Sequence, residues 1–479
     1  MPADRLTRSD AARPGVGIVH LGLGAFFRGF GAVYVADAIT ASGGDWGIVG
    51  VSLKSAATRD ALAPQDFAYQ VVSMRPEGET PRVVEVLEDV RVAPEDPEGL
   101  LALMADPAIR IVSLTVTEKG YCHEPSTGRL MFDHPDIVHD LTAPLPVSAP
   151  GFLVRALDRR RLAGVPPFTV LICDNLPENG KMLRGVVLDL ARRIDPTLAD
   201  WIAAECRFPS TMVDRITPAT TTADIDRLAK ATGHFDAAPV FCEPFRQWVV
   251  EDDFVGGIRP DLAAAGVEMV PDVTPYEHMK LKMLNGTHSA LAYLGYLGGH
   301  ETISDTVADP VFAGYVRGLW ADEIAPAVDA PEGVSLTDYA TALFDRYANP
   351  AIRHRTWQIA MDGSQKLPQR ILGTLETNFT AGRPSPGLCL AVAAWMRYVG
   401  GVDEAGQPIE VKDPMAVELR RVCDATPTPQ ARVKALLGLP QIFPEAIASK
   451  LEGPVTTAAT LLWQVGARKA AAQMTETST

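Results

Sequence analysis

The sequence has few cysteines, and no pattern joins them. Six are present among 479 residues: Cys122, Cys173, Cys206, Cys242, Cys389 and Cys423. Closely spaced pairs are typical of zinc sites, and dense cysteines are typical of disulfide-stapled secreted domains. Since no pair has the C-x-x-C spacing, we expect neither a metal site nor a disulfide framework. The composition suits a reducing cytoplasm.

Positive charge is also scarce. The chain has 44 Lys and Arg against 59 Asp and Glu, which gives a formal net charge of −15. Nucleic acids and anionic membrane surfaces attract proteins through excess basic charge, so neither is an expected partner. A local basic pocket for a small anion remains compatible with this balance.

Long hydrophobic runs are missing as well. No stretch approaches the roughly 18 consecutive apolar residues that a membrane span requires. The first residues, MPADRLTRSDAARPG, lack the apolar segment of a signal peptide. With 47% hydrophobic and 22% charged residues, the composition is typical of a globular protein. We therefore expect a cytoplasmic protein.

Strands alternate with helices in the first half of the chain. Apolar runs typical of buried strands are separated by stretches of helical periodicity. The predicted strands are 17–21, 46–53, 109–117 and 167–173, and two of the predicted helices are 151–164 and 181–194. Such alternation predicts an α/β fold with a mostly parallel, doubly wound sheet of the Rossmann type.

The second half has a different pattern. Long amphipathic segments dominate from about Pro275, including residues 276–297, 309–328 and 388–400, and strand signals nearly vanish. We predict a Rossmann-type dinucleotide-binding domain over residues 1–275 and a mainly α-helical substrate domain over residues 276–479. The last segment, AAAQMTETST, is expected to fray.

A glycine-rich turn follows the first predicted strand. Its sequence is Gly22-Leu23-Gly24-Ala25-Phe26-Phe27-Arg28. At this point of a dinucleotide-binding fold, glycines let the backbone approach a pyrophosphate at the start of a helix. The third glycine of the G-x-G-x-x-G pattern is absent, because Phe27 occupies its position. The context therefore favours cofactor binding by this segment, although the motif alone would suit an ordinary turn.

The second predicted strand ends without an acidic residue. In Rossmann proteins an Asp or Glu at that point binds the ribose 2′-hydroxyl of NAD. Here the strand ends in Ser52-Leu53-Lys54-Ser55, and Arg59 and Asp60 follow. Asp60 comes late for that role, whereas Lys54 or Arg59 could accept the 2′-phosphate of NADP. We expect NAD and leave NADP open.

Four polar residues share one arc of the predicted helix at 276–297. On a wheel of about 100° per residue, Lys280, His288 and Asn285 fall at roughly 0°, 80° and 140° and Glu277 near 60°. Burial lowers the pKa of a lysine, which can then act as a general base near neutral pH. An amide can stabilise an alkoxide, and an imidazole can bind a hydroxyl. Spacing alone is equally compatible with solvated helix residues.

Several segments together resemble one enzyme family. They are Lys280-x4-Asn285-x2-His288, SLTVTEKGYC (113–122), CDNLPENG (173–180), FPSTMVDRITPA (208–219), CEPFRQWVVEDDF (242–254) and GSQKLPQR (363–370). This combination resembles the polyol-specific long-chain dehydrogenases, the mannitol dehydrogenase family, over roughly residues 17–440. The resemblance implies a metal-independent, NAD(P)-dependent oxidoreductase with a Rossmann-type domain followed by a helical one.

The resemblance also assigns roles to matching residues. Lys280 corresponds to the catalytic general base, and His288 corresponds to a residue that positions the substrate. Asn285 and Asn175 correspond to the amides that polarise the carbonyl oxygen. Glu277 matches a glutamate that relays the lysine's proton to solvent.

Two positions near the cofactor need separate mention. Asp214, in VDRI, matches an acid near the family's active site, which we place on the cofactor side. Close relatives often have FHRAHQ after the glycine pair, where this chain has Phe26-Phe27-Arg28-Gly29-Phe30-Gly31. Any cofactor contact made by those histidines is therefore in doubt here.

Basic residues concentrate between positions 353 and 370 of this acidic chain. They are Arg353, His354, Arg355, Lys366 and Arg370. Arginine binds carboxylates in a bidentate manner, so the cluster favours a sugar-acid substrate, although surface ion pairs would explain it too. Residues 285–299 and 353–370 resemble the fructuronate reductase branch of the family, which implies interconversion of D-mannonate and D-fructuronate.

Two other functions stay open at this point. A polyol dehydrogenase such as mannitol 2-dehydrogenase would have no carboxylate to bind. A catalytically silent NAD(P)-binding sensor would need no general base, and the intact set of Lys280, Asn285 and His288 argues against it. The oligomeric state is also open, and a monomer is compatible with the sequence.

Overall fold

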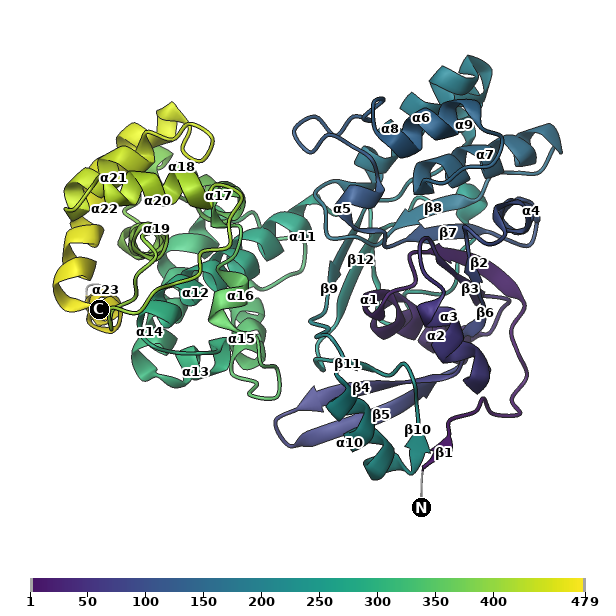
Figure 1. Ribbon diagram of the computed structural model, residues 1–479, viewed down its shortest axis with the longest axis horizontal. Coiled ribbons are helices and arrows are strands. Elements are labelled where there is room, and N and C mark those ends of the chain that lie inside the picture. The colour runs from purple at the N-terminus through teal and green to yellow at the C-terminus, as the bar shows by residue number, and fades with distance from the viewer. Residues whose placement is uncertain (1–2, 477–479) are drawn as a thin grey trace. The chain divides into compact units, whose positions relative to one another are not determined.

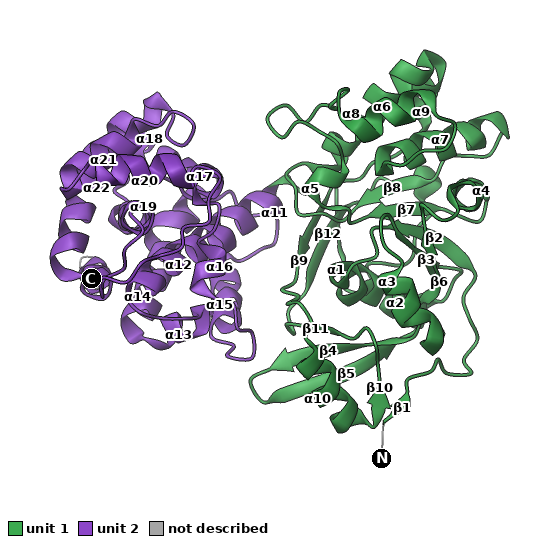
Figure 2. Cartoon of the chain, in the orientation of Figure 1, with its two compact units in different colours: residues 1–274 green, residues 275–479 purple. Residues whose placement is uncertain are grey.

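The computed structural model describes residues 3–476 and divides the chain into two compact units, residues 1–274 and 275–479 (Figure 2). The first unit combines sheets with helices, whereas the elements of the second are helical (Figure 1). The predicted order, a Rossmann-type sheet domain followed by a mainly helical part, is confirmed. None of the helices formed by residues 3–476 is long and apolar enough to span a membrane.

A five-stranded parallel sheet forms the centre of the first unit. The strands, in spatial order, are β6 (Leu87–Val92), β3 (Gly47–Ser52), β2 (Val16–Leu21), β7 (Ile111–Leu114) and β8 (Thr169–Ile172). Each neighbouring pair is parallel. Successive strands are therefore added on one side of β2 as far as β6, and the chain then crosses to the other side with β7 and β8. The strand order reverses between β2 and β7. In such sheets, ligands bind beyond the carboxyl ends of the strands at this switch point.

Helices cover both faces of this sheet and bury its apolar side chains. On one face, residues such as Val112 and Val170 pack into a core with Leu157 and Val187 of the covering helices. Those helices are α4 (Pro97–Ala105), α7 (Ala149–Leu162), α8 (Asn179–Ile194) and α9 (Pro196–Glu205). On the other face, a second core includes Ile18 and surrounds α1 (Ala25–Gly29) and α2 (Gly31–Ser42). Burial on both faces explains why the predicted strands are continuous apolar runs.

Smaller sheets complete the first unit. One joins β11 (Val240–Cys242), β4 (Tyr69–Arg75) and β5 (Gly78–Val84), another joins β13 (Glu268–Val270), β12 (Gln247–Glu251) and β9 (Thr211–Asp214), and a third pairs β1 (Asp4–Arg5) with β10 (His234–Phe235). The remaining elements are α3 (Ala57–Leu62), α5 (Thr117–Gly120), α6 (Pro135–Thr142), α10 (Thr222–Thr232) and the 3₁₀ turns η1 (Ala63–Gln65) and η2 (Val255–Gly257).

The second unit is built around two buried helices, α12 (Thr287–Leu297) and α19 (Pro386–Tyr398), which pack against each other (Figure 1). Helix α13 (Ile303–Ala308) also lies close to α12: a Cβ added at Gly295 would lie 2.4 Å from the Thr306 hydroxyl of α13. The other surrounding helices are α11 (Thr274–Met279), α14 (Pro310–Gly318), α15 (Leu336–Tyr347), α16 (Thr356–Ile359), α17 (Gly363–Leu367), α18 (Gly373–Thr380), α20 (Ala416–Asp424), α21 (Pro429–Leu437), α22 (Glu445–Val465) and α23 (Ala467–Glu476), with the 3₁₀ turn η5 (Ala325–Ala327).

The end of the chain differs from the expectation. Helix α23 continues to Glu476 and packs against α14 and α22, so residues 470–476 are helical rather than frayed. Buried alanines on this helix, Ala467, Ala470 and Ala471, explain the order, because they give it an apolar face. Residues 477–479 lie outside the described part of the chain.

Three π-helical turns interrupt the helices of the second unit: η3 (Lys280–Gly286), η4 (Leu319–Ile324) and η6 (Pro368–Leu372). Both η4 and η6 pack against η3. The segment predicted as one helix at 276–297 is therefore α11, η3 and α12 in succession. π-Helical turns are rare and occur frequently at functional sites.

Candidate active site

The glycine turn lies at the switch point of the Rossmann sheet. Gly22 has a φ of +91°, and a Cβ added there would lie 2.1 Å from the Thr115 carbonyl oxygen, which follows β7. Only glycine fits this conformation and this close approach. Gly24 is the N-terminal cap of α1, and as a glycine it has no side chain to bond the first N–H groups of the helix. The backbone at Gly24, Ala25 and Phe26 can therefore approach a pyrophosphate closely.

The aromatic residue in the third glycine position has a packing role. The Phe27 ring stacks on His20 of β2 with ring centroids 3.3 Å apart, and a Cβ at Gly31 would lie 2.5 Å from the ring. His20 in turn contacts the hydroxyls of Ser113 and Thr115 at 2.8 and 2.9 Å. Phe27 thus fills the space between β2 and α1. Gly31 leaves room for the Phe27 ring, because a side chain at position 31 would overlap it.

Arg28 and Asp214, both predicted on the cofactor side, are buried in the first unit. Arg28 donates to the Ala238 carbonyl at 2.5 Å, and its guanidinium lies over the Tyr69 ring. Burial lowers the pKa of Arg28, opposed by nearby Tyr69 and Asp236. Asp214 ends β9 and is 6% exposed. These surroundings give Arg28 a structural role, since its side chain is committed to the protein interior.

Arg215 is a residue that the sequence reasoning missed. It donates to the Gly29 carbonyl at 2.5 Å and to the Glu243 carbonyl at 3.0 Å. It therefore ties the end of α1 to the strands β9 and β11. Its position directly after Asp214, in the segment VDRI, was the available signal.

Asn175 lies in the loop after β8, at the same edge of the sheet as the glycine turn, and it is exposed. Its neighbour Asp174 accepts hydrogen bonds from the Val116 N–H at 2.9 Å and from the Tyr121 hydroxyl at 2.5 Å. Asn179 donates to the Asp174 carbonyl at 2.9 Å. The loop that carries Asn175 is therefore held from both sides, and its position is fixed by the fold.

The residues after the second strand also have defined positions. Arg59 forms ion pairs with Asp60 and Glu95. Lys54 is exposed. The positive charge of Arg59 is thus largely compensated by two carboxylates of the same unit, whereas Lys54 faces solvent.

In the second unit, Lys280, Asn285 and His288 come from η3 and the start of α12. Lys280 is 7% exposed and His288 is 8% exposed, whereas Asn285 is half-buried. In a π-helical turn the backbone hydrogen bonds join residues five apart rather than four. Lys280 and Asn285 have this spacing, so η3 brings them closer to one face than the α-helical wheel predicts.

Side chains from distant helices hydrogen-bond to the carbonyls of η3. The Trp320 indole donates to the Met283 carbonyl at 2.9 Å, and the Tyr347 hydroxyl donates to the Leu284 carbonyl at 2.8 Å. Thr287 donates to the Met283 carbonyl at 2.6 Å. Buried carbonyls require such partners, so these donors stabilise the wide turn.

Aromatic rings hold His288 in place. It stacks on Tyr347, with centroids 4.9 Å apart, and meets His354 edge to face at 4.8 Å. Tyr347 in turn stacks on Trp320 at 5.9 Å. Burial, followed by the neighbouring His354 and Arg370, lowers the pKa of His288 well below its usual value. The imidazole is therefore neutral at pH 7 and can donate and accept a hydrogen bond.

Three cations face this histidine. Arg346, Lys366 and Arg370 all contribute to lowering the pKa of His288. Burial lowers the pKa of both Lys366 and Arg370. Arg370 donates to the Ser289 hydroxyl at 3.1 Å, and its carbonyl lies 2.7 Å from where a Cβ at Gly286 would be. Lys366 also donates to the Met361 carbonyl at 2.7 Å and lies 3.8 Å from the Asp362 carboxylate, and its side chain is 27% exposed. The surroundings of His288 thus contain three basic side chains, of which Lys366 is partly compensated by Asp362.

The predicted basic cluster is divided by the structure. His354 packs against His288, and burial lowers its pKa to about 4. Arg353 and Arg355 have side chains that are 69% and 55% exposed, and both pair with Glu301. His354 and Lys366 therefore belong to the surroundings of His288, whereas the two arginines form a surface ion pair with one carboxylate. Arg346, which the sequence reasoning missed, joins the first group.

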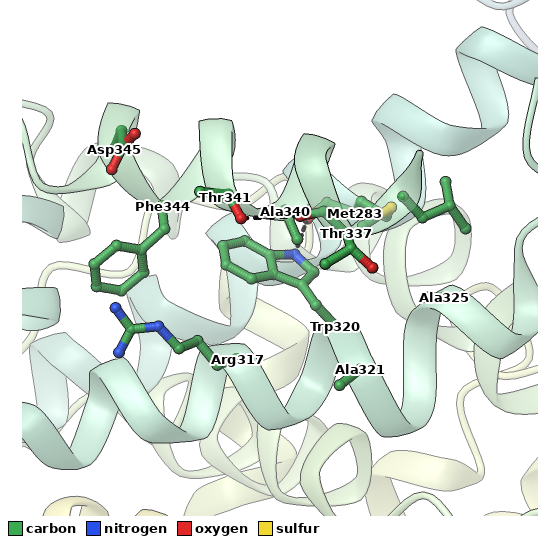
Figure 3. Close-up of a pocket in the computed structure, with 11 residues that line it drawn as sticks. Met283, Arg317, Trp320, Ala321, Ala325, Thr337, Ala340, Thr341, Phe344 and Asp345 are labelled. Carbon is green, nitrogen blue, oxygen red and sulfur yellow. Dashed lines mark hydrogen bonds between the residues drawn. The ribbon is translucent and has the colours of Figure 1, made fainter. Parts of the chain in front are cut away.

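A separate pocket of about 310 Å³ lies between α14–η4 and α15 (Figure 3). Figure 3 shows the Trp320 indole within it and the Arg317 guanidinium against Phe344, whose centroid is 3.9 Å away. Lys280, Asn285 and His288 do not line this pocket. It contacts η3 only through Met283, so it is distinct from the candidate active site.

Comparisons with known proteins agree with this arrangement. The Mannitol dehydrogenase Rossmann domain matches residues 16–263, and the Mannitol dehydrogenase C-terminal domain matches residues 272–463. D-mannonate oxidoreductase of Escherichia coli (strain K12) is 46% identical over 464 residues, which cover 95% of each chain. The uncharacterized oxidoreductase YdfI of the same organism is 49% identical over 429 residues, 89% of this chain and 88% of its own.

A solved structure gives the same result. Pseudomonas fluorescens mannitol 2-dehydrogenase, in ternary complex with NAD and D-mannitol, is 38% identical, with a TM-score of 0.82 over 99% of this chain and 97% of that chain. A Rossmann sheet with a glycine turn at its switch point is the arrangement of a dinucleotide-binding protein, and the matching families and relatives identify it as a dehydrogenase. The chain belongs to the mannitol dehydrogenase family, whose oxidoreductases act on secondary alcohols of polyols or sugar acids. The predicted family membership is thereby confirmed.

Proposed function

We propose that this protein is an NAD-dependent dehydrogenase that interconverts D-mannonate and D-fructuronate. The observation that carries the proposal is the group of cations, Arg346, Lys366 and Arg370, around the buried His288. Such a group suits a substrate with a carboxylate, because guanidinium and ammonium groups donate charge-assisted hydrogen bonds to carboxylate oxygens. The 46% identity to a protein named D-mannonate oxidoreductase supports the same substrate.

NAD suits the residues at the switch point of the first unit. Gly22, Gly24, Ala25 and Phe26 would hold its pyrophosphate, because they combine close backbone approach with the start of a helix. The ion pairs of Arg59 with Asp60 and Glu95 occupy its guanidinium, which favours NAD, whereas the exposed Lys54 leaves NADP open. When bound, the nicotinamide accepts or donates the hydride. Asp214 is assigned to the cofactor side by resemblance.

Lys280 would act as the general base of the reaction. In oxidation its Nζ accepts the proton of the C5 hydroxyl of D-mannonate, and in reduction the protonated lysine returns it to the ketone oxygen. By resemblance, Asn285 and Asn175 are the amides that would donate hydrogen bonds to that oxygen and stabilise its developing negative charge. Glu277 would relay the lysine's proton to solvent. Such a reaction requires no metal.

The substrate would be oriented by neutral and cationic groups. His288, held neutral by burial, would hydrogen-bond a neighbouring hydroxyl of the sugar chain. Lys366 and Arg370 would attract the carboxylate, with His354 beside them. Arg353 and Arg355 were expected in this role as well, but their shared ion pair with Glu301 favours a surface position outside it.

The experiment that tests the proposal measures NADH formation with D-mannonate and D-mannitol side by side, with and without a chelator. We expect turnover of D-mannonate that is insensitive to chelation. In the Arg370→Met variant, kcat/KM for D-mannonate should fall about 10- to 100-fold, because a hydrogen bond to a charged group is worth about 1.5–3 kcal/mol. The matched control Arg353→Met should leave kcat/KM unchanged.

The alternative is a mannitol 2-dehydrogenase or a related polyol dehydrogenase. The similarity to a structure with bound NAD and D-mannitol favours it. A rate on D-mannitol alone, with Arg370→Met having no larger effect than Arg353→Met, would establish this alternative. Binding of NADH without turnover of either substrate would instead favour a sensor.

A further inference from the structure

Cys122, His134 and Asp136 form a cluster in the first unit that the dehydrogenase reaction does not use. Each offers one ligand atom, and these atoms all lie within 4.8 Å of one another. The spacing in the sequence, twelve residues and then two, matches none of the common zinc patterns, which explains why sequence analysis predicted no metal. We propose that this cluster binds one Zn²⁺ ion through three protein ligands and an open fourth position.

The local fold brings these three residues together. A short hairpin closes through the Glu124 N–H to the Arg129 carbonyl at 2.8 Å and the Met131 N–H to the Cys122 carbonyl at 2.8 Å. The chain then turns into α6, where the His134 N–H bonds the Met131 carbonyl at 3.2 Å. The cluster therefore rests on backbone hydrogen bonds of the hairpin and on the first turn of α6, and its members are fixed relative to one another.

The donor set is one that zinc prefers. A thiolate, an imidazole nitrogen and a carboxylate oxygen bind Zn²⁺ at about 2.0–2.3 Å, and water completes a tetrahedron. Ligand atoms in such a site lie about 3.5 Å apart, so the cluster needs to contract by about 1 Å. The thiol is 2% exposed, whereas Asp136 is exposed, which gives an ion a path from solvent.

The electrostatic surroundings favour a cation at this point. The carboxylates of Asp136 and Asp140 and the ammonium of Lys54 all act on the Cys122 thiol, and the two carboxylates outweigh the single cation. A bound divalent ion would stabilise the thiolate. The competing interaction is a hydrogen bond from the Asp136 N–H to the His134 Nδ1 at 3.2 Å, a length at the weak end of the normal range.

The site lies next to the loop that supports the candidate active site. Cys122 has a φ of +52°, and the adjacent Tyr121 donates its hydroxyl to Asp174, the neighbour of Asn175. A zinc ion at Cys122 would hold the segment between α5 and the hairpin in place. This inference does not depend on the proposed substrate, because the ion is not part of the hydride transfer.

The test is a titration of the full-length, chelator-treated protein with Co²⁺ and Zn²⁺. We expect one equivalent of metal, a thiolate-to-cobalt charge-transfer band, and a higher thermal unfolding temperature with Zn²⁺. Cys122→Ser should abolish the band and weaken Zn²⁺ binding at least 100-fold. The matched control Cys206→Ser, which alters another buried thiol of the same unit, should bind as the unaltered protein does.

A second variant keeps the test decisive if Cys122→Ser does not fold. Asp136→Asn changes an exposed side chain and should weaken Zn²⁺ binding about tenfold while the charge-transfer band remains. The proposal is overturned if the unaltered protein gives no band, if the band persists in Cys122→Ser or disappears in Cys206→Ser, or if Asp136→Asn binds Zn²⁺ with unchanged affinity.

Discussion

Replacing Tyr347 by phenylalanine tests whether the π-helical turn η3 supports catalysis. The hydroxyl of Tyr347 donates to the Leu284 carbonyl at 2.8 Å and lies 2.9 Å from the Thr287 hydroxyl. The substitution removes this donor but keeps the ring that stacks on His288. Its effect therefore isolates the hydrogen bond from the aromatic packing.

The magnitude depends on the other donors to this carbonyl. The Leu284 carbonyl keeps the Thr287 N–H and, at 3.3 Å, the Thr287 hydroxyl as donors, so the substitution removes one hydrogen bond and leaves no acceptor unpaired. The free energy of unfolding of the protein should therefore fall by about 0.5–1.5 kcal/mol. Part of this lost free energy is the stability of η3 relative to an ordinary α-helical turn, because the Tyr347 hydroxyl hydrogen-bonds to a carbonyl of η3. With about 0.7 kcal/mol of that loss acting on the alignment of Lys280 with Asn285, kcat for D-mannonate should fall roughly threefold.

Denaturant unfolding and steady-state kinetics measure the two effects. The matched control is Tyr315→Phe, because that buried hydroxyl also donates to a carbonyl of the second unit, Gly387, at 2.9 Å, but away from η3. We expect both variants to lose similar stability and only Tyr347→Phe to lose turnover. Unchanged kcat in Tyr347→Phe, or an equal loss in Tyr315→Phe, would refute the reasoning.

Three further outcomes are expected. Lys280→Ala should lower turnover by several orders of magnitude while NADH still binds in a fluorescence titration; retained turnover would exclude the lysine as the base. Gly286→Ala should lower the free energy of unfolding by about 1–3 kcal/mol, since the new Cβ would lie 2.7 Å from the Arg370 carbonyl, and unchanged denaturation would contradict that contact. Glu323, whose carboxylate accepts from the N–H groups of Gly387 and Leu388 at 2.7 and 2.8 Å, has a pKa raised by burial from 4.5 to about 7. The folded state thus binds the proton more tightly, so this group's contribution to stability falls by about 3 kcal/mol as pH rises from 4.5 to 7. The stability difference between the unaltered protein and Glu323→Gln should show this slope, and a difference independent of pH would disprove it.

The central sheet could be predicted because its strands are buried on both faces. The apolar runs at 17–21, 46–53, 109–117 and 167–173 became β2, β3, β7 and β8, with ends shifted by a few residues. β6 was not predicted, because its sequence LEDVRV carries three charges at the edge of the sheet. Short strands such as β11 and β13 have only three residues each, too few for periodicity to be visible.

The site was predictable in its residue types and less so in its geometry. A helical wheel assumes an α-helix, whereas the carbonyls of η3 are bound by Trp320 and Tyr347, tens of residues further along the chain. Charge clustering in the sequence likewise could not separate Arg353, which pairs with Glu301, from Lys366, which faces His288. Such distinctions depend on tertiary contacts and leave no local pattern.

The contacts of Arg215 have a consequence for dividing the protein. The five-stranded sheet is complete at Ile172, which suggests that a minimal nucleotide-binding module could be cut shortly afterwards. Yet Arg215 bonds the Gly29 carbonyl at the end of α1, and Arg28 bonds the carbonyl of Ala238. A graft that ends before Arg215 would therefore retain the strands but lose both groups that hold the phosphate-binding helix in place, and one that ends between Arg215 and Ala238 would lose the second. A transferable cofactor module of this chain must therefore extend at least to Ala238, well beyond the last strand of the central sheet.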